Sequence, residues 1–163
     1  MMAIAAWRDV YAAEGTDAER GAMPILNERD SREVQSQLAA LSGPVKLVNF
    51  TQELACQYCR ETEQLLREVR ELSDKISLEI YNFQLDKEKV AQYRVDKIPA
   101  TVVEGSRDYG IRFYGIPFGY EFVPFLEAIK DVSRGSTSLT PETRAALAGV
   151  HEPVHLQVFT TPT

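Results

Sequence analysis

The feature that most limits the fold of this chain is the motif CQYC, which holds its only two cysteines, Cys56 and Cys59. Residues 45–50, just before the motif, form an apolar run that is typical of a strand buried on both faces. After the motif, apolar residues recur at helical spacing over about 65–72, which predicts an amphipathic helix reaching about Lys75. The cysteine pair should therefore lie at the N-terminus of this helix.

The segments on either side supply the remaining elements of one domain. A helix is predicted from Asn27, and Ser42-Gly43-Pro44 should end it. Residues 76–83 alternate like a strand and 87–93 favour a short helix. The later part of the domain is predicted to hold a buried strand at 100–103, a turn at 108–110, a returning strand at 111–116 and a helix from about Gly119.

Read from Val45 to Arg134, the order of these elements is βα, βα, ββα. That order predicts an α/β protein with a thioredoxin-like fold, in which helices flank a mixed central sheet. The predicted domain covers 23–134 and follows an N-terminal extension at 1–22. A linker at 135–153 should contain a short helix after Thr140-Pro141.

The last ten residues repeat a pattern from the start of the domain. VHLQVFT at 154–160 matches VKLVNFT at 45–51 at the positions V-x-L-x-x-F-T. We therefore expect 154–163 to be the opening strand of a second, truncated thioredoxin-like unit.

Composition excludes several function classes. The chain has 18 basic and 24 acidic residues and a net charge of −6, which argues against nucleic acid as a partner. It contains no apolar run near the ~20 residues that span a membrane, so no membrane partner is expected. The opening residues are too short and wrongly flanked for a signal peptide, and we expect a cytoplasmic protein.

The predicted position of the motif favours thiol chemistry. A thiol must lose its proton to become a nucleophile, and a free cysteine with a pKa of ~8.5 is mostly protonated at neutral pH. Unpaired N–H groups and the dipole at a helix N-terminus favour the thiolate. We expect Cys56 to attack a substrate disulfide and Cys59 to resolve the mixed disulfide. The structural alternative is a pair of buried small residues or an incidental disulfide.

Three signals together resemble a known family. CQYC at a helix start, the dipeptide Ile98-Pro99 about 40 residues on and the run YGIPFGYEF at 114–122 resemble the protein disulfide oxidoreductases. These are cytosolic, glutaredoxin-like proteins of two tandem thioredoxin folds, each with its own CxxC. The resemblance covers roughly 44–163. It implies a dithiol–disulfide oxidoreductase of cell redox homeostasis that acts on protein disulfides without a cofactor or metal, with a thioredoxin reductase-type flavoprotein as a candidate reductant.

The resemblance also assigns roles around the cysteines. It implies that the bond before Pro99 is cis and that the backbone of Ile98 pairs with the substrate chain. Gly115 would flank the same groove, although a plain turn glycine is an equal alternative. Tyr58, inside the motif, would touch the substrate or simply cover the helix end.

The chain departs from the thioredoxin pattern at two positions. Asn49 stands nearest to the buried aspartate that thioredoxins carry in this strand, and an amide cannot act as a general base. Glu53 is a candidate replacement, with a solvated loop carboxylate as the plainer interpretation. Ala55 replaces the tryptophan before the first cysteine.

Three alternatives to this function remain open at this point. Cys56, Cys59, His151 and His155 have zinc-ligand spacings within each pair, although 91 residues separate the pairs (151 − 59 − 1). A redox-silent scaffold would use the fold without the thiols. A glutathione-dependent glutaredoxin would need a cationic groove, to which Arg60 and Lys97 could contribute.

Overall fold

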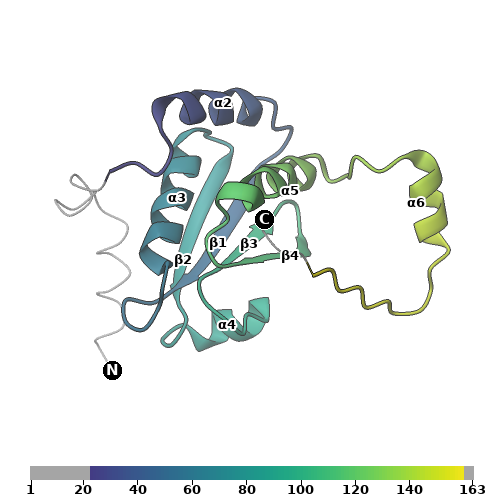
Figure 1. Ribbon diagram of the computed structural model, residues 1–163. Coiled ribbons are helices and arrows are strands. Elements are labelled where there is room, and N and C mark those ends of the chain that lie inside the picture. Colours follow the sequence, from purple (N-terminus) through teal and green to yellow (C-terminus); the bar gives the residue numbers. More distant parts are fainter. Residues whose placement is uncertain (1–22, 160–163) are drawn as a thin grey trace.

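A mixed sheet of four strands, in the order β2-β1-β3-β4, forms the centre of the molecule (Figure 1). The computed structural model describes residues 23–159, so the predicted extension at 1–22 and residues 160–163 lie outside the described part. The strands are β1 (Val45–Thr51), β2 (Ile76–Asn82), β3 (Ala100–Glu104) and β4 (Asp108–Tyr114). The helices are α2 (Glu28–Leu38), α3 (Cys59–Glu71), α4 (Lys87–Tyr93), α5 (Phe122–Arg134) and α6 (Pro141–Ala148), with the 3-10 turn η2 (Gly119–Glu121) before α5.

Strand β1 is central, as its apolar sequence predicted. It pairs in parallel with β2 and antiparallel with β3, and β4 pairs antiparallel with β3. Successive side chains of β1 point to opposite faces. Val45 and Leu47 join the core beneath α2, α3 and α5, whereas Val48 and Phe50 pack with Tyr93 of α4. Both faces of the strand are therefore covered, and the predicted mixed sheet flanked by helices is confirmed.

The turn between β3 and β4 lies earlier than predicted. The sequence suggested a turn at 108–110, but Gly105 N–H donates to the Arg107 carbonyl at 3.2 Å and β4 already starts at Asp108. Gly110, with φ +84°, follows a register shift in the ladder and belongs to a bulge inside the strand. This turn requires glycine at position 105, because a Cβ there would lie 2.4 Å from the backbone oxygen of Val132.

Two helix boundaries also refine the predictions. Helix α3 ends at Glu71 rather than near Lys75. The chain turns at Ser73, whose carbonyl accepts the N–H of Ile76, the first residue of β2. The last helix of the domain begins with η2 at Gly119 and continues as α5. Its proline, Pro124, lies in the first turn, where its missing N–H costs no hydrogen bond.

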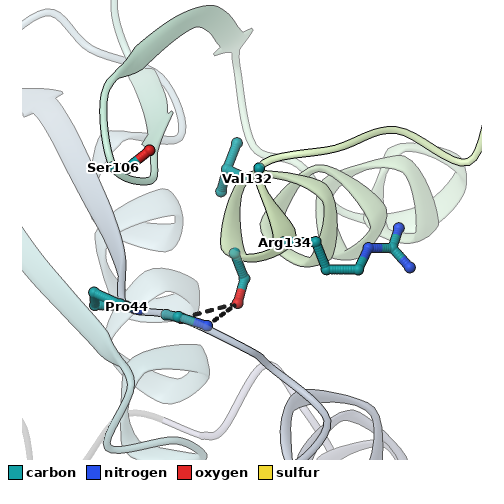
Figure 2. Close-up of a pocket in the computed structure, with 7 residues that line it drawn as sticks. Pro44, Ser106, Val132 and Arg134 are labelled. Carbon is teal, nitrogen blue, oxygen red and sulfur yellow. Dashed lines mark hydrogen bonds between the residues drawn. The ribbon is translucent and has the colours of Figure 1, made fainter.

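The end of α5 is fixed to the beginning of β1. The Ser133 hydroxyl accepts from the Gly43 N–H at 2.9 Å and donates to the Gly43 carbonyl at 2.8 Å. Figure 2 shows these two bonds beside a small pocket lined by Pro44, Ser106 and Val132. This pocket lies where β1 begins, at the end of the sheet opposite the cysteines.

Residues 135–159 leave the domain and carry α6 away from the sheet (Figure 1). The predicted helix is present, and the Thr140 hydroxyl caps it by accepting the Thr143 N–H at 3.2 Å. The strand predicted from Val154 is absent from the described residues 154–159, which are exposed coil. A strand needs a neighbour for its backbone groups, and none pairs with this segment. That the segment opens a second unit stays a prediction.

We expect a chain ending at Arg134 to fold and to keep the Cys56–Cys59 disulfide, because every described residue after it is exposed. The same cut should lower any self-association, since it removes the exposed side chains of Val154, Leu156 and Phe159. Circular dichroism, thermal melting and gel filtration would measure these effects. As a control, a chain ending before α5 should not fold, because it lacks the buried face of that helix. A chain ending at Arg134 that fails to fold would show that the domain extends further.

Candidate active site

The candidate site lies at the end of the sheet where β1 stops. The segment 52–58 connects β1 to α3 and carries Cys56, while Pro99 immediately precedes β3. Because β1 and β3 are antiparallel, with Phe50 opposite Ala100, the end of one strand meets the beginning of the other. The topology thus brings together two predicted site segments that lie about 40 residues apart in the sequence.

The two cysteines form a disulfide and differ in exposure. Cys56 and Cys59 are bonded, with their Cα atoms 5.6 Å apart. Cys59 is the first residue of α3 and is 2% exposed, whereas Cys56 lies in the loop before the helix and is half-buried. Cys56 is therefore the sulfur that an external thiol or disulfide can reach, which agrees with the role expected for it.

Tyr58 shapes the start of the helix. Its backbone is left-handed, with φ 69°, and its carbonyl accepts both the N–H and the hydroxyl of Thr62, at 2.9 and 2.6 Å. The tyrosine side chain makes no capping hydrogen bond and is half exposed. The first N–H groups of α3 thus remain available next to the disulfide, where they favour a thiolate after reduction.

Pro99 lies immediately before β3, at the same end of the sheet as this loop. The Ile98–Pro99 peptide bond is cis, as the resemblance implied. Gly115 donates its N–H to the Pro99 carbonyl at 2.9 Å and has φ +90°, a conformation that favours glycine. Pro99 is buried and Ile98 half-buried. The structure brings Ile98, Pro99 and Gly115 together, and their contacts with a substrate stay a prediction.

Comparison with known proteins agrees with this geometry. A family model described as a thioredoxin domain matches residues 46–115, which include β1, the CQYC motif, the cis proline and β4. The chain therefore has a thioredoxin-like fold over these residues. The mixed sheet flanked by helices and the placement of the motif at a helix start are those that the sequence predicted for this fold.

Solved structures extend the likeness beyond the matched residues. A protein disulfide oxidoreductase from Aeropyrum pernix is 26% identical, with a TM-score of 0.69, and the match covers 80% of this chain and 57% of that one. The alkylhydroperoxide reductase protein AhpF from Enterococcus faecalis is 24% identical, with a TM-score of 0.68, and the match covers 77% of this chain and 61% of that one. The chain thus spans less than two thirds of the length of either protein. No curated protein matches it.

The sheet carries a buried polar pair, of which sequence reasoning identified only one member. Asn49 of β1 is fully buried, as its alignment with the thioredoxin aspartate suggested. Thr101 of β3, which sequence reasoning missed, lies directly opposite Asn49 and is also fully buried. The side-chain amide of Asn49 and the hydroxyl of Thr101 make no hydrogen bond to any described residue. Glu53, the candidate replacement base, is exposed.

Exposed apolar side chains occur in the loops that carry the site. Leu54, two residues before Cys56, is 81% exposed, and Phe118, three residues after Gly115, is 45% exposed. Sequence reasoning missed both, because an isolated apolar residue in a loop gives no periodic signal. Leu54 is thus an exposed apolar side chain close in sequence to Cys56, and Phe118 lies 6.0 Å from Phe122, measured between ring centres.

Lys97 and Arg60, the two cations considered for glutathione binding, are both exposed. The Lys97 ammonium lies 3.6 Å from the Asp96 carboxylate and 5.5 Å from the centre of the Tyr114 ring. Burial raises the pKa of the Tyr114 phenol above its usual value, and the Asp96 carboxylate adds to the rise. These contacts leave most of the Lys97 side chain in solvent, so whether either cation binds glutathione stays a prediction.

The four residues considered as zinc ligands are not assembled into a site in the described part of the chain. Cys56 and Cys59 are bonded to each other, and His151 and His155 are exposed on the segment after α6. Over 23–159, no group of three or more candidate ligands from histidine, cysteine, aspartate and glutamate is placed to hold a metal. Within the same residues, no helix is long and apolar enough to cross a membrane.

Proposed function

We propose that this chain exchanges disulfides with protein substrates through Cys56 and Cys59, in the cytoplasm. The observation that carries the proposal is the asymmetric disulfide at the start of α3, with one sulfur accessible and the other buried. The cis proline at the same end of the sheet and the likeness to a protein disulfide oxidoreductase support it. The cytosol keeps thiols reduced, and there a CxxC pair is more often catalytic than structural.

The reduction of a substrate proceeds in two exchange steps. The Cys56 thiolate attacks one sulfur of the substrate disulfide, forms a mixed disulfide and releases the other substrate sulfur as a thiolate. The Cys59 thiol then loses its proton, and its sulfur attacks Cys56 Sγ. The Cys56–Cys59 disulfide re-forms and the second substrate thiolate leaves. Two electrons pass from the domain to the substrate, and a thiol or a flavoprotein reductant must restore the dithiol.

The proposal predicts that the reduced domain cleaves the disulfides of a model protein such as insulin. The control is the same protein after reduction and alkylation of both thiols, which should have no activity. Loss of insulin disulfides, followed by mass spectrometry, measures the reaction. Equal rates for the free and the alkylated protein would overturn the proposal.

The same preparation distinguishes the proposed function from that of a glutathione-dependent glutaredoxin, through the reductant that restores the dithiol. If glutathione alone restores the dithiol rapidly and a thioredoxin reductase with NADPH does not, the glutaredoxin function is the better description. The reverse result favours a thioredoxin reductase-type flavoprotein as the partner.

A further inference from the structure

Asn49 and Thr101 are unusual, because protein cores rarely leave buried polar side-chain atoms without a hydrogen-bond partner. Both side chains are 0% exposed, and neither the amide nor the hydroxyl has a hydrogen-bond partner within residues 23–159. A buried polar group without a partner destabilises the folded state, whereas an apolar side chain of similar size would not. Two such groups on adjacent strands suggest a partner that is present in another state of the protein.

The topology places this pair at the end of the sheet that the first turn of α3, with Cys59, covers. Asn49 shares a face of β1 with Leu47, which packs in the same core as Leu65 of α3. Because β2 is parallel to β1, the intervening helix α3 runs back along the sheet, so its first turn lies over the last residues of β1. Asn49 is two residues from the end of β1, and Cys59 and Thr62 are the buried residues of that first turn.

The Cys59 sulfur changes its hydrogen-bonding capacity with redox state. In the disulfide it carries no proton and no charge, so it is a weak partner for an amide. After reduction it is either a thiol, which can donate to the Asn49 carbonyl oxygen, or a thiolate, which accepts from the Asn49 amide N–H. A hydrogen bond to the charged form lowers the pKa of a thiol and makes it a better leaving group.

We propose that Asn49, supported by Thr101, is a positioning residue that binds the Cys59 sulfur in the dithiol state and is left unpaired in the disulfide state. The pair therefore stabilises the reduced form selectively and makes the domain a stronger oxidant than it would be with an apolar residue at this position. The inference rests on the proposed function, because it concerns the same redox couple. It gives the amide a role that needs no proton transfer.

The test is the redox equilibrium of the Cys56–Cys59 pair against glutathione, in which the disulfide and two glutathione molecules give the dithiol and oxidised glutathione. Asn49→Leu should shift this equilibrium toward the disulfide by about tenfold, the effect of one hydrogen bond to a charged group. For a two-electron couple this corresponds to about 30 mV. Thr101→Val should shift it in the same direction by a smaller factor.

A structural role alone predicts a different result. If the pair only fills the core, or binds a buried water in both states, Asn49→Leu changes the melting temperature of both redox forms equally and leaves the equilibrium unchanged. The proposal instead requires Asn49→Leu to stabilise the oxidised form more than the reduced form. Val103→Ala is the matched control, since Val103 is buried two residues from Thr101 and should destabilise both forms without shifting the equilibrium.

Each outcome decides the proposal. An equilibrium that changes less than twofold in Asn49→Leu overturns it, and if that variant does not fold, an unchanged equilibrium in Thr101→Val does the same. Failure of the wild-type pair to exchange with glutathione or protein disulfides would instead overturn the proposed function. An unchanged equilibrium in the variants, with normal exchange in the wild type, would overturn only the inference about Asn49.

Discussion

Cys56→Ser should abolish disulfide exchange with a protein substrate, because it removes the only sulfur of the pair that the structure leaves accessible. The remaining thiol, Cys59, is 2% exposed and cannot meet a disulfide on another protein without opening of the site. Insulin reduction should fall to the rate of the alkylated protein. The variant tests the division of roles, since a hydroxyl is close in size to a thiol and should leave the fold intact.

Cys59→Ser should behave in the opposite way. Cys56 can still attack, but no second thiol follows it, so the mixed disulfide accumulates as a covalent complex. Non-reducing electrophoresis should show this complex with Cys59→Ser and not with Cys56→Ser. Accumulation in Cys56→Ser instead would mean that Cys59 is the attacking residue and that the roles assigned from burial are reversed.

Phe125→Ala should cause a large loss of stability. Phe125 is fully buried and packs edge-on against Phe113, with ring centres 5.4 Å apart, and lies 6.5 Å from Phe122. Truncating a buried phenylalanine costs about 3–5 kcal/mol. Since a domain of this kind is stable by about 5–15 kcal/mol, the variant should melt more than about 10 °C lower or fail to fold.

Helix α5 offers a matched control for this prediction. Val123 lies two residues earlier in the same helix and is 61% exposed. Val123→Ala should therefore change the free energy of unfolding by less than about 0.5 kcal/mol. Equal melting temperatures for the two variants would show that α5 does not pack on the sheet as described.

The sequence was sufficient for the parts of the structure that depend on local pattern. The apolar run of β1, the helical spacing after Cys59 and the Thr140-Pro141 signal each predicted an element that is present. The cysteine pair was placed correctly at the start of α3, because its two neighbours in the sequence have strong and different periodicities. The cis bond before Pro99 came from the family resemblance, since a proline at a strand start has no cis signal of its own.

The features that the sequence did not predict depend on contacts between distant segments. The residues at 108–110 predicted a turn. The pairing of β3 with β4 and the hydrogen bond from Gly105 to Arg107 place the turn earlier. Thr101 could be recognised as the partner of Asn49 only from the strand register, which sets the two residues opposite each other. In the sequence alone, an isolated threonine in a buried strand gives no sign that it pairs with another buried polar residue.

The length of β1 separates two ends of the domain. Seven residues of strand separate the Cys56 loop from the end where Gly43, Ser106 and Ser133 meet, a distance of roughly 20 Å. A fluorescent reporter or an affinity handle inserted between Ser106 and Arg107, both exposed, would therefore sit remote from any bound substrate. Gly105 must stay in place, because its contact with α5 tolerates no side chain. A sensor built in this way would immobilise or report on the domain while leaving the thiols free to react.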